Sequence, residues 1–597
     1  MCPYFLARNN IGNADAVIFS YQYVIDPKAS EMVMSEVRPD SIVVFDEAHN
    51  IDNVCVEALS VRYDKEAHKE ASYGYNELAK RVNDRLASTQ AKLAAEYERL
   101  SAGLHQARSE SAGAPGAATH ELRHEPIPEE LLATFERAVP GNIRKAKHFM
   151  EYLKTFLVYL EERLAGSTAR TASPAEWVHE FKTAYHVPVE GLKFMSSRLS
   201  LLLETLEVRN YARYSSLHAA ADLATLAGST GVVSQETPQY KVVEEPQQVV
   251  DEVSRPASVS FCCLDAAPIF EVVCGRFRNV VVTSGTLSPL GMYRQLLRVE
   301  PAVAASVRVT LPRGRECVLP TVLSKGNDQA AITSKKRTLL EEYQADGGEE
   351  LASKPITRNY GNVLVELSAV VPDGVVGFFP SYTFMDRMVT EWKSEGILDS
   401  VLENKLVFFE TTNARESAVA LHNYKVACDC GRGGVLLAVA RGKFSEGIDF
   451  ANQYGRCVIM FGTPFMDTRN YAFRARTEYL YAAYHIRMGD FLTFDAVRAA
   501  SQCVGRTIRG KTDYALMVFA DSRYVRFGVR GKLPGWILSF LTRPRIGLTT
   551  DSVATLAKDF YRRMGQPFSQ EEQLGTSLWT LEDIERNKDT IATQGVY

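Results

Sequence analysis

A run of four apolar residues that ends in two carboxylates most constrains how this 597-residue chain folds. Ile42-Val43-Val44-Phe45 precedes Asp46 and Glu47, which predicts a strand buried on both faces with the acids at its carboxyl end. Open α/β sheets bind ligands at that edge. An aspartate there can hold Mg²⁺ through water, and a glutamate can polarise the water that attacks a γ-phosphate. An acidic helix start is the alternative, because helix N-termini favour carboxylates.

Sheet-like sequence flanks a long helical block. Strand-like runs at residues 16–19 and 42–45 give way, over residues 63–210, to apolar positions three and four residues apart. These positions include Phe149, Leu153, Phe156, Leu157, Leu160 and Leu164, and then Leu192, Met195, Leu199, Leu202 and Leu206. Strand patterns return at residues 259–262 and 280–283. The order predicts that the helical block is inserted into a sheet domain.

A second alternation of strand-like and helical segments runs to the C-terminus. Its apolar runs are residues 375–379, 406–409, 435–439, 458–461 and 516–519. Within the helical block, Ser173-Pro174-Ala175-Glu176 predicts a helix start. Residues 109–119 predict a flexible excursion, and residues 325–355 predict a long or partly disordered loop. The coarse architecture is two sheet domains with a helical insertion.

Composition narrows the class of partner and compartment. The net charge is −4, so a nucleic-acid partner would have to bind local basic patches. Ten scattered cysteines form neither a disulfide framework nor a complete zinc-site spacing, which indicates a reducing compartment. No apolar segment approaches the ~20 residues that cross a bilayer. We therefore expect a soluble, intracellular protein without a membrane partner.

Two turns after strand-like runs carry groups that suit phosphate chemistry. Ser284, Gly285 and Thr286 lie in a hydroxyl-rich turn that suits coupling near phosphate or nucleic-acid backbone, although an ordinary strand-ending turn has the same composition. The segment 440–450 combines two glycines, two cations and a terminal acid, and its backbone can contact a phosphate chain or ribose. A strand followed by a glycine-rich loop is also common without such a role.

A polar helix face is the third signal. Gln502, Arg506 and Arg509 recur at four and three residue intervals, which places them on one face of a predicted helix. Arginines that reach a γ-phosphate accelerate its transfer by roughly 10³ to 10⁵. A solvated basic face is the plainer alternative. Together with the acidic pair, this face predicts a cleft between two sheet domains.

These four segments occur in the order of motifs II, III, V and VI of superfamily 2 helicases, and the chain resembles the XPD helicases throughout. The further matching segments are residues 2–8, 46–54, 358–362, 509–514, 532–534 and 566–568. The resemblance implies an ATP-dependent helicase that moves 5′ to 3′ on single-stranded DNA. It also implies a nuclear subunit of TFIIH, acting with the other TFIIH subunits in nucleotide excision repair and in transcription by RNA polymerase II.

The fold implied by the resemblance is α/β, with two RecA-like parallel-sheet motor domains, the first incomplete, and an inserted, mainly helical Arch domain. The expected parts are an iron-sulfur remnant (1–8), a partial first motor domain (9–62), the Arch (63–257), a return to the first motor domain (258–295) and the second motor domain (296–597). The implied cofactors are ATP, Mg²⁺ and a [4Fe-4S] cluster. Cys2 stands at the position of the fourth cluster ligand.

The resemblance also implies a role for each motif residue. Asp46 would carry Mg²⁺, Glu47 would activate water and His49 would couple the site to the other motifs. Gln502, Arg506 and Arg509 would bind or stabilise the phosphates. The expected nucleotide and coupling residues are Ser284, Gly285, Thr286, Gly447 and Asp449, and the expected DNA-binding residues are Arg441 and Lys443. For Arg523, Arg526 and Arg530, surface solvation is at least as good an interpretation as DNA binding.

The sequence departs from the family pattern at its start. It contains neither a P-loop G-x-x-x-x-G-K-[ST] nor the three other cluster cysteines upstream of Asp46. We expect a fragment with negligible ATPase activity, exposed apolar faces and an unpaired sheet edge. Genomic DNA upstream of Met1 is expected to encode the missing elements in frame.

The sequence leaves two alternatives to a DNA helicase. Either the parent protein is a DNA helicase and this chain holds half of its catalytic site, or the chain is a non-catalytic module that binds TFIIH subunits without ATP turnover. An RNA helicase of the Asp-Glu-Ala-His type is a third reading. The helical insertion and the cluster-type cysteine argue against this third reading.

Overall fold

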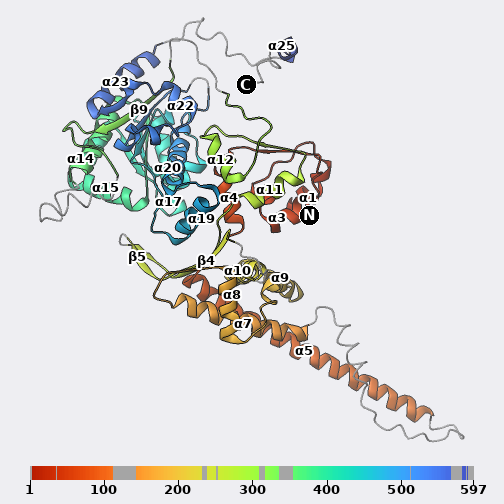
Figure 1. The fold of residues 1–597 in the computed structure, drawn as a ribbon. Helices are drawn as coiled ribbons and strands as arrows, with labels where there is room; N and C mark the ends of the chain where they lie inside the picture. Colours follow the sequence, from red (N-terminus) through yellow and green to blue (C-terminus); the bar gives the residue numbers. More distant parts are fainter. Residues whose placement is uncertain are drawn as a thin grey trace. The chain divides into compact units, whose positions relative to one another are not determined.

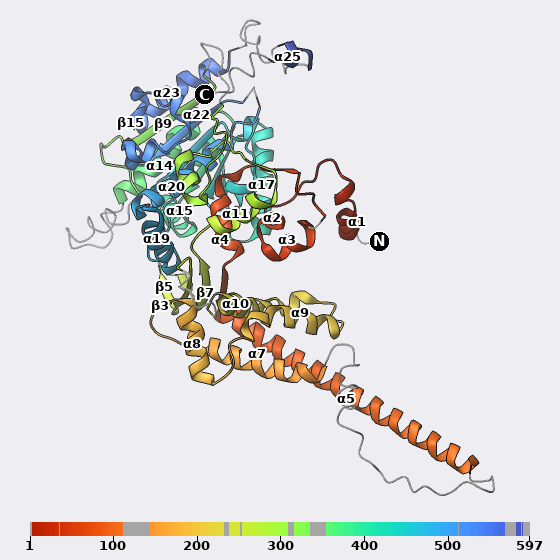
Figure 2. The same cartoon turned by 45° about the vertical axis from the view of Figure 1, so that its right-hand side comes forward.

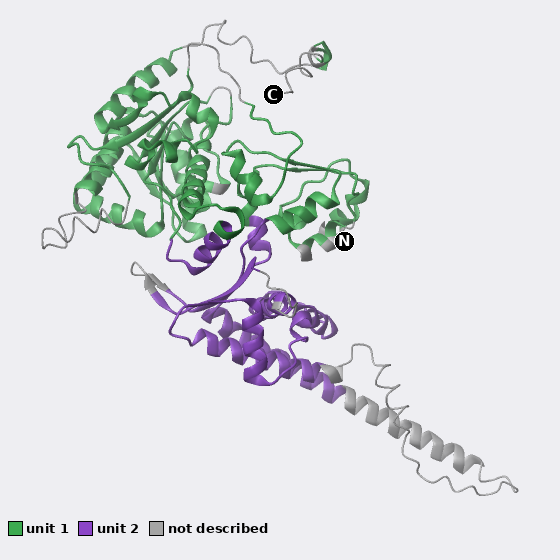
Figure 3. Ribbon diagram, in the orientation of Figure 1, with its two compact units in different colours: residues 1–53, 267–467, 481–597 green, residues 54–266, 468–480 purple. Residues whose placement is uncertain are grey.

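The protein is described by a computed structural model that covers residues 3–34, 36–111, 143–231, 238–250, 253–307, 316–334, 354–510, 513–566, 581–586 and 588. It divides into two compact units (Figure 3). Unit 1 comprises Met1–Asn53, Ala267–Asp467 and Tyr481–Tyr597, and unit 2 comprises Val54–Ala266 and Thr468–Leu480. Most of unit 2 thus lies between two parts of unit 1 in the sequence, which confirms the predicted insertion.

A seven-stranded parallel sheet forms the centre of the larger part of unit 1, in the order β11-β12-β10-β13-β14-β9-β15 (Figure 1). Its strands are β9 (Val318–Lys325), β10 (Gly374–Phe379), β11 (Leu406–Phe409), β12 (Gly434–Val439), β13 (Cys457–Phe461), β14 (Ala515–Ala520) and β15 (Ile546–Thr549). The five predicted strands are confirmed. β9 and β15 were missed, and β9 contains Pro320, which a sequence pattern takes as a break.

Helices cover both faces of this sheet, as Figures 1 and 2 show. One core contains residues of α14 (Lys354–Val370), α15 (Tyr382–Ser394), α16 (Ile397–Asn404) and α23 (Thr550–Met564). The other contains residues of α17 (Ala414–Asp429), α20 (Met488–Gly505) and α22 (Gly535–Phe540). Side chains of β10, β12, β13 and β14 are buried throughout, as expected of strands covered on both faces.

A second, two-stranded parallel sheet in unit 1 carries the acidic motif. β1 (Ile42–Phe45) pairs with β8 (Asn279–Val282). The prediction that β1 is buried on both faces is wrong, because Ile42 is 66% exposed and Val44 is 57% exposed. Only the Phe45 side of the strand is covered, by the rings of Tyr21 and Phe270. The expected exposure of apolar surface is confirmed by Ile42 and Val44. The expected unpaired edge is also found, since among the described residues β1 and β8 have no further neighbouring strand.

Short helices precede and follow the two strands of this small sheet in the sequence. They are α1 (Pro3–Asn9), α2 (Gln22–Ile25), α3 (Pro27–Met34), α4 (Ile51–Ala58), α11 (Ala267–Arg276) and α12 (Leu290–Leu297). The strand predicted at residues 16–19 is wrong: the segment is irregular and Ile18 is 97% exposed. An apolar run forms a strand only where another strand pairs with it, and no described strand does so here.

Unit 2 combines helices with an antiparallel sheet. The helices are α5 (Lys65–Ser111), α7 (Ile143–Leu164), α8 (Pro174–Tyr185), α9 (Met195–Thr205) and α10 (Ser215–Gly231). The sheet has the order β2-β7-β4-β3, formed by Val61–Asp64, Ser258–Cys263, Tyr240–Glu245 and Arg170–Ala172. β5 (Gln248–Val250) and β6 (Val253–Arg255) pair separately. The first part of α19 (Tyr471–Tyr484) also belongs to this unit.

The local predictions for unit 2 are largely confirmed. The apolar positions of both predicted helices are buried, except Leu206, which is partly buried. Ser173 and Glu176 form the reciprocal hydrogen bonds of a capping box at the start of α8. Of the predicted excursion, residues 109–111 belong to α5, and residues 112–119 lie outside the described residues.

The predicted long loop is only partly described. Residues 326–334 follow β9 as an irregular segment, residues 335–353 lie outside the described part, and α14 begins at Lys354. Within the part of the chain that the structure describes, no helix combines the length and apolar character needed to cross a membrane.

Candidate nucleotide site

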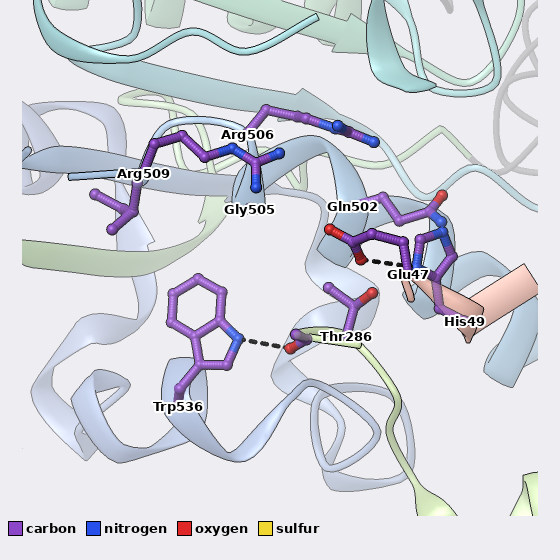
Figure 4. A pocket seen from close by; sticks show the side chains of 10 residues that line it. Glu47, His49, Thr286, Gln502, Gly505, Arg506, Arg509 and Trp536 are labelled. Atoms are coloured by element: carbon purple, nitrogen blue, oxygen red, sulfur yellow. Dashed lines mark hydrogen bonds and ion pairs between the residues drawn. The ribbon is translucent and has the colours of Figure 1, made fainter. Parts of the chain in front are cut away.

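A pocket of about 220 Å³ in unit 1 brings the acidic motif and the polar C-terminal motif together (Figure 4). It is lined by Glu47, His49, Gly285, Thr286, Gln502, Gly505, Arg506, Ile508, Arg509 and Trp536. The first four come from segments that follow β1 and β8, and the others from the end of α20 and beyond. The predicted cleft is therefore lined by segments that follow the strands of the small sheet, by α20 and the segment after it, and by α22. Both of these helices pack on the seven-stranded sheet.

Glu47 lies in the left-handed backbone region, with φ of 51°, which is uncommon for a residue with a side chain. Its Oε2 accepts a hydrogen bond from the Ser284 hydroxyl at 2.9 Å and lies 3.3 Å from His49 Nδ1. His49 Nδ1 lies 3.1 Å from Ser284 Oγ. These three side chains join the end of β1 to the turn after β8.

These contacts keep the Glu47 carboxyl ionised. The hydrogen bond with His49, followed by the hydrogen bond from Ser284 and the charge of Arg506, lowers the pKa of Glu47 from 4.5 to about 2, although partial burial opposes the shift. At neutral pH the side chain is a carboxylate at the wall of the pocket. Such a group can accept a hydrogen bond from a water molecule and orient it.

Asp46 is exposed beside the pocket and is not among its lining residues. Its Oδ1 accepts the backbone N–H of Glu47 at 3.0 Å, and the hydroxyl of Tyr21 donates to its carbonyl oxygen. Burial, and then the charges of Asp46 and Glu47, raise the pKa of Tyr21 to about 12. An exposed carboxylate at the carboxyl end of a parallel strand is a suitable oxygen ligand for Mg²⁺.

The two arginines of the C-terminal motif are not on a helix, which corrects the sequence prediction. α20 ends at Gly505, Arg506 is its C-cap residue, and Arg509 lies in the segment that follows. Gln502 alone lies within the helix. All three nevertheless line the pocket, because the turn after Gly505 brings both arginines back towards it (Figure 4).

Asp449 contacts both arginines. Its Oδ1 accepts from Arg509 Nε at 2.8 Å and lies 2.5 Å from Arg509 Nη2 and 3.6 Å from Arg506 Nη1. Arg506 Nε also donates to the carbonyl oxygen of Ser445 at 3.0 Å. The glycine-rich segment after β12 therefore holds the guanidinium groups at the pocket.

The other residues predicted in that segment lie outside the pocket lining. Arg441 Nη2 pairs with Asp495 Oδ2 at 2.5 Å, and Lys443 Nζ donates to the carbonyl oxygen of Thr412 at 2.9 Å. Gly447 is the last residue of the short helix α18 (Lys443–Gly447). Both cations are exposed but engaged with protein groups.

Sequence reasoning missed a buried ion network behind the pocket. Arg498 pairs with Asp52 and Asp495, each at 2.6 Å, and donates to the carbonyl oxygen of His49 at 3.0 Å. The Tyr293 hydroxyl donates to the same carbonyl at 2.8 Å. Although burial opposes it, the two carboxylates raise the pKa of Arg498. The spacing of Asp495, Arg498 and Gln502 on one face of α20 was a usable signal.

Trp536 was also missed, and no sequence pattern pointed to it. Its indole Nε1–H donates to the carbonyl oxygen of Gly285 at 3.1 Å (Figure 4). The indole thereby ties the turn after β8 to α22, which packs against the seven-stranded sheet.

The predicted cluster ligand Cys2 lies outside the described residues. Within the described residues there is no group of three or more His, Cys, Asp or Glu side chains that could hold a metal ion. The cysteines of this part therefore do not fit a four-iron cluster, which needs four ligands.

Comparison with known proteins gives consistent matches along the chain. Family models described as "Helicase C-terminal domain", "Helical and beta-bridge domain" and "DEAD_2" match residues 364–540, 81–231 and 1–67. A solved structure titled "XPD_Helicase" aligns with 92% of this chain and 75% of that chain, at 13% sequence identity and a TM-score of 0.48.

Relatives in other organisms are much more similar. The XPD helicase subunit of general transcription and DNA repair factor IIH from Dictyostelium discoideum is 45% identical, over 98% of this chain and 72% of the relative. The XPD/RAD3 subunit of Saccharomyces cerevisiae is 40% identical, over 100% of this chain and 73% of the relative. The two parallel sheets and the helical and β insertion agree with two RecA-like motor domains and an Arch. The chain belongs to the family of XPD helicase subunits.

Proposed function

We propose that this protein is an ATP-dependent DNA helicase and that the pocket is part of its ATP-hydrolysing site. The observation that carries the proposal is the convergence of the ionised Glu47 with Arg506 and Arg509 on one pocket. A carboxylate facing two guanidinium groups across a cavity suits a reaction in which water attacks a phosphate and the negative charge has to be stabilised.

Each residue has a distinct task in the proposed reaction. Asp46 would hold Mg²⁺ through water, and the ion would supply charge neutralisation at the phosphates. Glu47 orients the attacking water, while Gln502, Arg506 and Arg509 contact the γ-phosphate. These guanidinium groups are in place before the reaction, because Asp449 and Ser445 already bind them.

We assign coupling to DNA to the contacts between the end of β1 and the turn after β8, and to the loop after β12. His49 and Ser284 connect the carboxylate to the turn after β8, and that turn includes Gly285 and Thr286. Gly447 and Asp449 lie in the loop that also carries Arg441 and Lys443, for which we propose contact with the DNA backbone. Movement of this loop would then follow the state of the phosphates.

The names of the relatives mention transcription, DNA repair and factor IIH, and the resemblance to XPD helicases implies the finer functional assignments. We infer translocation 5′ to 3′ on single-stranded DNA, a place in TFIIH beside its other subunits, and roles in nucleotide excision repair and in transcription by RNA polymerase II in the nucleus. The proposed parts are the iron-sulfur remnant, the two-part first motor domain, the Arch and the second motor domain, with the bounds predicted from the sequence. The [4Fe-4S] cluster, with Cys2 at the position of its fourth ligand, is proposed for the full-length family only, because the cysteines of the described residues do not fit it.

The test uses the protein as its own cells express it. DNA-stimulated ATP hydrolysis and strand separation are measured for the wild type, Glu47→Gln and Arg506→Ala. We expect turnover to fall by about 10² to 10³ in each variant, because each loses a group aimed at the transition state. Arg387→Ala, on an exposed helix face where Arg387 pairs with Glu391, is the control and should retain turnover.

Two outcomes would count against the proposal. Turnover that survives both pocket substitutions would place ATP hydrolysis elsewhere. A wild-type protein that assembles with TFIIH subunits but hydrolyses no ATP would support the non-catalytic interaction module.

A further inference from the structure

Glu410 is a buried carboxylate that lies outside the four motif segments identified in the sequence. It follows β11 directly and is only 1% exposed. Its Oε1 accepts hydrogen bonds from the Tyr382 hydroxyl at 3.0 Å and from the backbone N–H of Lys443 at 2.8 Å. Its Oε2 accepts the backbone N–H of Val439 at 2.9 Å. The donors are a phenol and two amides, so hydrogen bonds alone replace the water that this carboxylate loses on burial.

Gly442 leaves room for the Glu410 carboxylate in the turn after β12. A Cβ atom on Gly442 would lie 2.6 Å from each carboxylate oxygen of Glu410, which is closer than any side chain tolerates. A glycine is therefore needed at position 442, because a side chain there would block the carboxylate of Glu410 from the N–H of Lys443. Close approach, rather than an unusual backbone angle, explains this glycine.

The same turn leads directly to the pocket. The Ser445 hydroxyl, fully buried, donates to the carbonyl oxygen of Gly442 at 2.8 Å. The carbonyl oxygen of Ser445 accepts Arg506 Nε at 3.0 Å. Three hydrogen bonds, linked by the backbone of residues 442–445, thus join the Glu410 carboxylate to the guanidinium group of Arg506.

The scaffold behind Glu410 is rigid. Its backbone N–H donates to the carbonyl oxygen of Leu437 at 2.8 Å, which continues the pairing of β11 with β12. The Glu410 carboxylate, fixed at the end of β11, therefore binds the turn that follows β12. Supporting groups of this kind determine how accurately a reacting group is placed.

We propose that Glu410 is a positioning residue that fixes the turn at residues 439–445 and, through Ser445, the orientation of Arg506. The consequence for catalysis rests on the proposed function of the pocket, whereas the control of the turn does not. Glu410 touches neither substrate nor reacting atoms, and it acts through the turn.

Hydrogen–deuterium exchange on the 597-residue chain tests the control of the turn. In Glu410→Gln, an amide replaces one acceptor oxygen and faces a backbone N–H, so exchange at residues 439–445 should rise by about ten-fold. Tyr382→Phe removes one of the three donors and should give a smaller rise in the same segment. Glu403→Gln, the same change at an exposed carboxylate of α16, should leave the segment unchanged.

The results separate a positioning role from a general structural one. A rise confined to residues 439–445 and to the segment around Arg506 supports the proposal. Unchanged exchange in Glu410→Gln, or an equal rise throughout unit 1, overturns it. If Glu410→Gln does not fold, the local rise in Tyr382→Phe decides the question, and its absence overturns the proposal.

ATP turnover in the protein as its own cells express it provides the second measurement. A misplaced Arg506 should lower kcat by about ten-fold with little change in KM, because the arginine acts mainly on the transition state. An unchanged kcat would overturn the catalytic part of the proposal. Absence of turnover in the wild type would instead contradict the proposed function, and the exchange result would still report on Glu410.

Discussion

Arg498 and Asp52 form an ion pair in which Nη1 and Oδ1 lie 2.6 Å apart, and both side chains are almost completely buried. Asp52 belongs to α4, which follows the acidic motif, and Arg498 belongs to α20, which carries Gln502. The pair therefore connects the two walls of the pocket within unit 1. The bond from Arg498 to the carbonyl oxygen of His49 adds a second connection.

Arg498→Met should lower the free energy of unfolding of unit 1 by about 3 to 5 kcal/mol. The substitution leaves the buried carboxylates of Asp52 and Asp495 without their shared cation. Urea unfolding measures the effect. Arg387→Met, which breaks an exposed pair with Glu391, should cost less than about 1 kcal/mol, and equal losses in the two variants would contradict the prediction.

Glu47 should make stability depend on pH in an acidic window. Its pKa is lowered in the folded protein from 4.5 to about 2, so its ionised form stabilises the fold above pH 4.5, and this contribution is lost as pH falls towards 2. Urea midpoints of wild type and Glu47→Gln should therefore converge across that window. Ser284→Ala removes one hydrogen-bond donor and should narrow the window. A difference that stays constant from pH 5 to about 2 would contradict the assignment.

Asp449→Asn should strengthen anion binding at the pocket. The carboxylate occupies both Arg506 and Arg509, and its loss leaves their charge available to a phosphate. Because Asp449 is about half exposed, we expect an affinity gain for pyrophosphate of about five-fold at low salt, which shrinks at high salt. Calorimetric titration measures it. Asp490→Asn, an exposed change in the first turn of α20, should have no effect, and an equal gain there would point to net charge alone.

Ser173→Ala should lower the stability of unit 2 by about 1 kcal/mol. Ser173 caps α8 by accepting the N–H of Glu176, and Glu176 returns a bond to the N–H of Ser173. Thermal unfolding measures the loss. Ser88→Ala is the control, because it removes a hydroxyl on the exposed surface of α5 that does not cap a helix. A comparable loss of stability in this variant would contradict the role of the capping box.

Much of the local structure was predictable from the sequence because its determinants are local. Strands and helices bury side chains at a fixed period along the sequence. That period is visible in the apolar runs of β10 to β14 and in the spacing of Phe149 to Leu164. The cap at Ser173 depends on residues within one turn. The acidic motif after β1 was recognisable for the same reason, since its chemistry is contained in adjacent residues.

Contacts between distant residues were decided only by the tertiary structure. Periodicity placed Arg506 and Arg509 on a helix, whereas the helix ends at Gly505 and a turn brings both to the pocket. The composition of β1 indicated burial, but Ile42 and Val44 are exposed, because burial of a strand side chain depends on which distant elements pack on that face of the sheet. Pairing of Arg498 with Asp52, and of Glu410 with the N–H of Lys443, joins residues brought together only by packing of whole elements. Local sequence patterns predicted most of the elements and the acidic motif, whereas the packing of whole elements determines which distant groups meet, because such contacts have no local period.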